Sequence, residues 1–78
     1  MVKRRLIFTF PPELVTEPVI YNLTMQFRLV TNIRHADITE KGGWVELELE
    51  GEEKDIEEGI TWVTSKGVRV NFLPGSAL

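Results

Sequence analysis

The fold is decided by residues 32–51, which read NIRHADITEKGGWVELELEG. Apolar and polar residues alternate in both halves, and a period of two is typical of a β-strand with one buried face. Gly42 and Gly43 interrupt the pattern, since glycine accepts the positive φ that tight turns require. The stretch therefore predicts a hairpin, with strands over residues 32–40 and 44–50 and a turn at residues 41–43.

The alternation also predicts which residues of the hairpin are buried. We expect Ala36 and Ile38 to join the core, opposite Leu49 and Leu47 respectively. Arg34 would then share their face, because every second residue of a strand points the same way. A guanidinium aimed at a buried layer indicates either a frayed strand end or a ligand site.

The segments around the hairpin have the patterns of two strands and two helices. An alternating strand over residues 3–10 ends at two prolines, and a helix over residues 17–29 begins at a proline in its first turn. A second helix is expected over residues 53–66, followed by Gly67 as its left-handed cap and by a last strand over residues 68–72. The apolar stripe of this second helix includes Gly59. Glycine in a helix lowers stability by roughly 1 kcal/mol relative to alanine, so its presence predicts that the helix lies close to the sheet at this point.

Two apolar rows follow the first helix. The core row, at helical spacing, is Val19, Ile20, Leu23, Phe27 and, if the helix reaches it, Val30. Tyr21, Met25 and Leu29 form a second row on the opposite side. This second row is either a set of ordinary exposed apolar side chains or a surface for a partner.

The order of elements is β-α-β-β-α-β. It predicts an α+β, ferredoxin-like βαββαβ fold, in which two helices cover one face of a four-stranded antiparallel sheet. The domain spans residues 3–73, and residues 74–78 form a short tail. Many unrelated functions share this fold, so function has to be argued from particular residues.

Composition excludes several classes of function. The chain has 78 residues, a net charge of −3 and no cysteine, which argues against nucleic-acid binding and excludes a disulfide or a cysteine-ligated metal. No signal peptide or membrane-spanning segment is evident, so we expect a cytoplasmic protein without membrane insertion.

The residues that could carry chemistry are few. His35 and Asp37 could form a base and its orienting carboxylate, but a solvent-facing histidine is favoured. The alternating carboxylates Glu46, Glu48 and Glu50 could bind a hard cation, although a solvated strand face is favoured. Trp44 and Trp62 could stack on a ligand or, as is more usual, cover a margin of the core or a subunit interface. We therefore predict no catalysis, no cofactor and no metal.

Several short motifs occur together in a characteristic order. They are Phe10-Pro11, Glu17-Pro18-Val19-Ile20, Asn32-Ile33 with Ala36 and Ile38, Gly43, Gly51, Ile60-Thr61-Trp62-Val63 and Gly67-Val68-Arg69-Val70. In this order and spacing the chain resembles a NIL domain, the small regulatory domain that ends many ATP-binding subunits of methionine ABC importers.

The resemblance implies an ACT-like domain that pairs as a homodimer and binds methionine at or near the dimer interface. It also implies a ligand role for Asn32, which begins the Asn-Ile run, with Ile33 lining the pocket. An amide suits an amino-acid ligand, because it donates to a carboxylate and accepts from an ammonium group. Arg34 stands where the family usually has an apolar residue, and its guanidinium could anchor a carboxylate.

Two functions remain open. The first is a stand-alone small-molecule-binding regulatory domain that senses an amino acid such as methionine at a dimer interface. The second is a non-catalytic protein-interaction module, linked to sulfur assimilation or to a ferredoxin or transporter partner. In the second case Tyr21, Met25 and Leu29, or an open sheet edge, would form the working surface.

Overall fold

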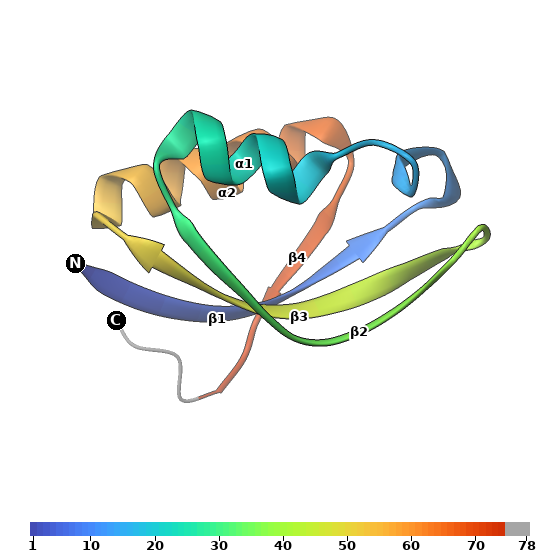
Figure 1. Ribbon diagram of the computed structural model, residues 1–78, viewed down its shortest axis with the longest axis horizontal. Helices are drawn as coiled ribbons and strands as arrows, with labels where there is room; N and C mark the ends of the chain where they lie inside the picture. Colours follow the sequence, from blue (N-terminus) through green and yellow to red (C-terminus); the bar gives the residue numbers. More distant parts are fainter. Residues whose placement is uncertain (75–78) are drawn as a thin grey trace.

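A computed structural model describes residues 1–74 and shows a four-stranded sheet with both helices on one face (Figure 1). Neighbouring strands are antiparallel, in the order β2-β3-β1-β4. The α+β, ferredoxin-like fold predicted from the sequence is confirmed. The elements are β1 (Val2–Phe10), the 3-10 turn η1 (Pro12–Leu14), α1 (Val19–Phe27), β2 (Val30–Thr39), β3 (Gly42–Gly51), α2 (Glu53–Lys66) and β4 (Arg69–Phe72). Of the predicted tail, residues 75–78 lie outside the described residues.

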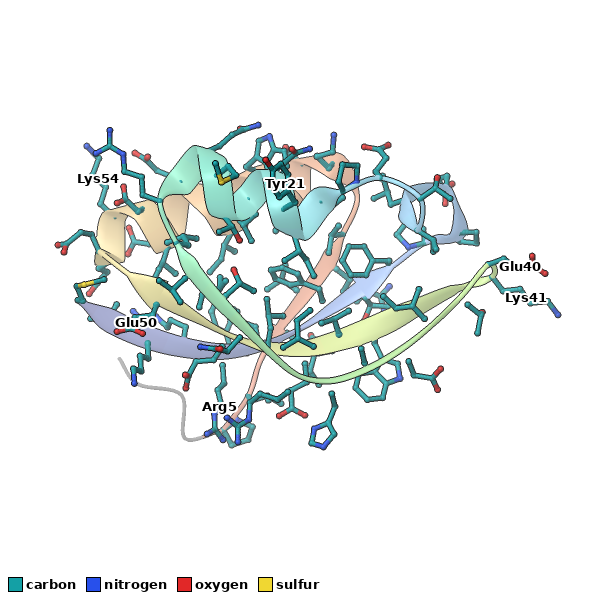
Figure 2. The ribbon with its side chains drawn as sticks, in the orientation of Figure 1. Arg5, Tyr21, Glu40, Lys41, Glu50 and Lys54 are labelled. Atoms are coloured by element: carbon teal, nitrogen blue, oxygen red, sulfur yellow. The ribbon has the colours of Figure 1, made fainter. Side chains whose placement is uncertain are left out.

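The core lies between the helices and the two central strands. The strands contribute every second residue, as the alternation predicts, and each helix contributes one apolar stripe. The fully buried members include Leu6, Phe8, Val19, Leu23, Val45, Leu47, Leu49, Ile56 and Val63. The opposite face of the sheet carries no helix, and Figure 2 shows Arg5 on that open face.

The hairpin differs from its prediction in turn and register. Glu40 and Lys41 form the turn, and both glycines belong to β3. Ile38 therefore pairs with Gly43, and Ala36 pairs with Val45. The predicted pairings with Leu47 and Leu49 are wrong, because they assumed that Gly42 and Gly43 lie outside the ladder.

Arg34 occupies a β-bulge, and this explains why it does not share a face with Ala36 and Ile38 as the alternation predicted. Ile33 pairs with Leu47 and His35 pairs with Glu46, so the residue between them has no partner opposite it. An inserted residue switches the alternation. Ile33, Ala36 and Ile38 consequently face the helices, and Arg34 does not point into a buried layer.

The predicted burial of Ala36 and Ile38 is also wrong, because β2 is an edge strand. Ala36 is exposed, and Ile38 retains 44% of its accessible surface. In Figure 1 the tip of the hairpin extends beyond the N-terminal end of α1, and Figure 2 shows Glu40 and Lys41 at this tip. The helix therefore covers the central strands and leaves the end of β2 open.

Helix α1 is shorter than predicted, at Val19–Phe27 instead of residues 17–29. Arg28 adopts the left-handed conformation with φ 57°, and this reverses the chain into β2. Val30 consequently begins the strand instead of extending the helical stripe, and it is exposed. Leu29 turns inward and is only 3% exposed.

Replacement of Arg28 by glycine is expected to stabilise the protein. The left-handed conformation is costly for a residue with a Cβ atom and nearly free for glycine. We expect Arg28→Gly to raise the free energy of unfolding by about 0.5–1 kcal/mol, measured by urea denaturation. Gln26→Gly, in the helical part of α1, is the control and is expected to lower the stability by roughly 1 kcal/mol. A loss of stability in Arg28→Gly would contradict this view of the helix end.

Helix α2 has the predicted bounds, and Gly67 caps it with φ 108°. Its Gly59 packs against the first helix and the chain that follows it, which corrects the expected approach to the sheet. A Cβ atom on Gly59 would lie 2.7 Å from Cδ1 of Leu23 and 3.3 Å from Cδ1 of Leu29. The glycine thus lets α2 pass close to α1 and to Leu29.

Candidate ligand pocket and open strand edge

The β2 strand forms one edge of the sheet, and exposed apolar side chains lie both on it and on α1. Ile33 is 57% exposed and Ile38 is 44% exposed, both on the side that faces the helices. On α1, Tyr21 and Met25 are 64% and 62% exposed. Such exposure on an unpaired edge strand is typical of a binding surface.

Leu29 does not share this exposure. The second apolar row of the sequence included it, but the left-handed turn at Arg28 places Leu29 in the core. The apolar surface of α1 is therefore formed by Tyr21 and Met25.

Helix α1 and β2 are held together beneath this surface by two threonines. The Thr24 hydroxyl donates to the carbonyl of Ile20 at 2.9 Å and lies 2.8 Å from the hydroxyl of Thr31. A hydroxyl has one proton, so with that bond in place Thr31 donates to Thr24. The bond fixes the beginning of β2 relative to α1.

A shallow pocket of about 170 Å³ lies between η1, the start of α1 and the far end of β2. Its walls are largely apolar and include Phe10, Leu14, Pro18, Ile20, Tyr21 and Ile38. The charged residue in its lining is Glu17, whose carboxylate lies 3.3 Å from Nζ of Lys66. No motif in the sequence points to this pocket, and only Pro11-Pro12 indicates an irregular connection there.

The three residues predicted to bind ligand lie in succession on β2 but do not converge on this pocket. Asn32 pairs with Glu48, on the face without helices, whereas Ile33 faces the helices. The Arg34 side chain makes no hydrogen bond or ion pair with the other described residues, 1–74. Within one chain, Ile38 is the residue of β2 that lines the pocket.

The open face of the sheet carries paired charges. The His35 side chain is 72% exposed, and its Nδ1 atom lies 3.4 Å from Oε1 of Glu46. Nε of Arg5 lies 3.7 Å from Oε2 of Glu48. Within residues 1–74, no three acidic or histidine side chains are grouped so that they could hold a metal ion.

The two tryptophans have different surroundings. The ring of Trp62 lies 5.9 Å from that of Phe27, and Nζ of Lys66 lies 5.4 Å from the centre of its ring. Trp62 thus covers the margin of the core between the helices, which is the more usual of the two roles expected for it. Trp44 is exposed and pairs with Thr9 and Asp37 on the open face.

Within the described part of the chain, neither helix has the length and apolar character needed to cross a membrane.

Comparison with known proteins identifies the family. A search of curated proteins finds no matching sequence. Among solved structures, the chain is similar to the C-terminal domain of an ABC transporter ATP-binding protein from Enterococcus faecalis, with a TM-score of 0.82 and 18% identity. The match covers 92% of this chain and 84% of that domain, and it shows a shared fold. The family model for the NIL domain matches residues 4–71, so the chain belongs to the NIL domain family.

Proposed function

We propose that this protein is a non-catalytic regulatory domain of the cytoplasm that binds a small amino acid, such as methionine, at the interface of a homodimer. The observation that carries the proposal is the apolar pocket of about 170 Å³ beside Tyr21 and Ile38, two exposed apolar residues at the edge of the molecule. Pockets for drug-sized ligands are larger, roughly 300–1,000 Å³, so this volume suits a small side chain.

The chemistry of the lining agrees with an amino-acid ligand. An unbranched thioether side chain fits irregular apolar walls such as those formed by Leu14, Pro18 and Ile20. The Glu17 carboxylate can accept hydrogen bonds from an ammonium group. A carboxylate requires a donor, and Asn32 and Arg34 are the candidates that the sequence provides.

Calorimetric titration with methionine tests the proposal. We expect measurable heat, together with NMR shift changes at the amides of Tyr21 and Ile38. Tyr21→Glu is expected to weaken binding at least tenfold, because it places a second carboxylate beside Glu17 in an apolar pocket. Thr61→Glu, on the exposed side of α2, is the matched control and leaves binding unchanged. No heat and no shift changes at millimolar methionine would refute the proposal.

A second function is favoured by the exposure of Tyr21 and Met25 on one side of α1. In this case the domain is an interaction module that docks on a transporter subunit or a ferredoxin. Large exposed apolar residues next to each other on a helix are typical of such a surface.

Charge substitution on α1 distinguishes this second function. Met25→Glu is expected to abolish capture of a transporter subunit or ferredoxin partner in a pull-down, since docking would bury the new charge. Gln26→Glu, at another exposed position of α1, is the control and is expected to capture the same partner in the pull-down. An unchanged partner list with Met25→Glu would exclude this surface.

A further inference from the structure

Trp44 is a large aromatic residue on the open face of the sheet. Its neighbour in β3, Val45, is only 1% exposed and faces the helices, so Trp44 points to the opposite side. Trp44 retains 39% of its accessible surface, although it lies on a central strand between β1 and β2. Among residues 1–74, neither an aromatic ring nor a cation stacks on its ring. The indole ring is therefore accessible to a partner.

Two carboxylates border this ring. Asp37 lies directly opposite Trp44 on β2, and the Cβ atoms of such antiparallel pairs are about 4.5–5.5 Å apart. Glu46 is the next residue of β3 on the same face, roughly 7 Å along the strand. The remaining neighbour, Thr9 on β1, is uncharged. Negative groups thus lie on two sides of the ring.

Neither carboxylate has a permanent cation as its partner. Within residues 1–74, Asp37 makes no ion pair. Glu46 lies 3.4 Å from Nδ1 of His35, which is charged only when it is protonated. Arg69 is on the same face in β4, but β1 separates it from Trp44 by two strand spacings, or about 10 Å. The surface around the ring therefore carries negative charge that a partner can neutralise.

An exposed indole ring beside two carboxylates suits a guanidinium group. A cation within about 6 Å of the centre of a tryptophan ring is attracted to the negative face of the ring. A guanidinium group is planar, so it can stack on the ring while its N–H groups point outward in its own plane and donate to carboxylates. The compact ammonium group of lysine lacks this geometry.

The same charges argue against a nucleic acid on this face. A nucleobase could stack on Trp44, but the phosphates of the strand would meet Asp37 and Glu46 on a chain with a net charge of −3. A basic segment of a protein gains from the ring and from both carboxylates. Charge complementarity therefore favours a protein partner.

We propose that the open face of the sheet binds an arginine-bearing segment of a partner protein at Trp44. The guanidinium group stacks on the indole ring, and its N–H groups donate to the carboxylates of Asp37 and Glu46. This surface lies on the other side of the sheet from the apolar pocket, which is lined by residues such as Ile38 and Phe10 that face the helices (Figure 1). The proposal therefore goes beyond the proposed function and does not depend on methionine binding.

A labelled peptide tests the proposal without methionine. The probe is a tetra-arginine peptide blocked at both ends, and its fluorescence anisotropy is followed as the protein is added. We expect saturable binding that weakens as salt is added, since the carboxylates are exposed. In NMR spectra, the indole N–H signal of Trp44 is expected to shift and that of Trp62 to stay in place. The Trp62→Phe variant assigns the two signals.

Variants of the open face identify the groups that bind. Trp44→Leu, which remains folded by circular dichroism, is expected to weaken binding at least tenfold, because the stacking surface is lost. Asp37→Asn and Glu46→Gln are each expected to weaken it about threefold. Glu57→Gln removes the same charge from the exposed side of α2, is the matched control, and leaves binding unchanged.

The outcomes distinguish the possible partners. No binding at millimolar peptide, or full binding by Trp44→Leu, would overturn the site. Equal binding of a tetra-lysine peptide would overturn the stacked guanidinium. Tighter binding of a single-stranded oligothymidylate would overturn the choice of a protein partner. Loss of methionine binding in calorimetry, with peptide binding intact, would refute the proposed function and leave this surface standing.

Discussion

Leu47→Ala is expected to remove a large part of the protein's free energy of unfolding. Leu47 lies on the central strand β3, is fully buried, and pairs with Leu6 on one side and Ile33 on the other. Truncation of such a leucine costs about 3–5 kcal/mol, because the cavity that it leaves does not collapse completely. The whole stability of a 78-residue domain is roughly 4–12 kcal/mol.

Urea denaturation followed by circular dichroism measures the effect. Leu47→Met, which nearly conserves the volume, is the control and is expected to cost less than about 1.5 kcal/mol. If Leu47→Ala unfolded at the same urea concentration as the unchanged chain, the layer between sheet and helices would not be the core of the protein.

Gly43→Ala is expected to distort the pairing of β2 with β3 in the hairpin that contributes Ile38 to the pocket. A Cβ atom there would lie 2.3 Å from the carbonyl oxygen of Asp37 and 2.6 Å from Cα of Ile38. Both are backbone atoms, so β2 has to move away from β3 at the point where Ile38 reaches the pocket. Overpacking of this kind costs about 1–3 kcal/mol.

The consequence for function is expected to be larger than the loss of stability. We expect Gly43→Ala to remain folded by circular dichroism and to lose methionine binding and dimer formation, measured by calorimetry and light scattering. Lys41→Ala, at the exposed turn of the same hairpin, leaves both unchanged. Normal binding by Gly43→Ala would show that the end of β2 is not part of the site.

The sequence predicted the features that depend on local chemistry. The bounds of α2, its cap at Gly67 and the order of strands and helices follow from periodicity and from glycine and proline positions. The predicted end of α1 was wrong because Arg28 adopts the left-handed conformation, which arginine rarely takes. Leu29 is therefore buried in the core, although the helical pattern placed it on the surface.

The features that were missed depend on contacts between distant segments. The bulge at Arg34 is defined only by the pairing of β2 with β3, so the alternation within β2 could not reveal it. The pocket joins the connection after β1 to Ile38, residues far apart in the chain. The sequence did place Asn32, Ile33 and Arg34 together on a strand, and their role in binding stays a prediction.

In the proposed homodimer each pocket is shared between two subunits, and mixing two binding-deficient variants tests this sharing. Arg34→Gln removes the guanidinium and leaves the pocket lining unchanged. Tyr21→Glu places a charge in the pocket lining and leaves the guanidinium of Arg34 in place. Neither variant alone is expected to bind methionine well. After the two are mixed and allowed to exchange subunits, about a quarter of the pockets combine an intact pocket with an intact Arg34. We expect calorimetry to detect this recovered fraction at the affinity of the unchanged protein. Two variants that each bind poorly and show no recovery on mixing would contradict it.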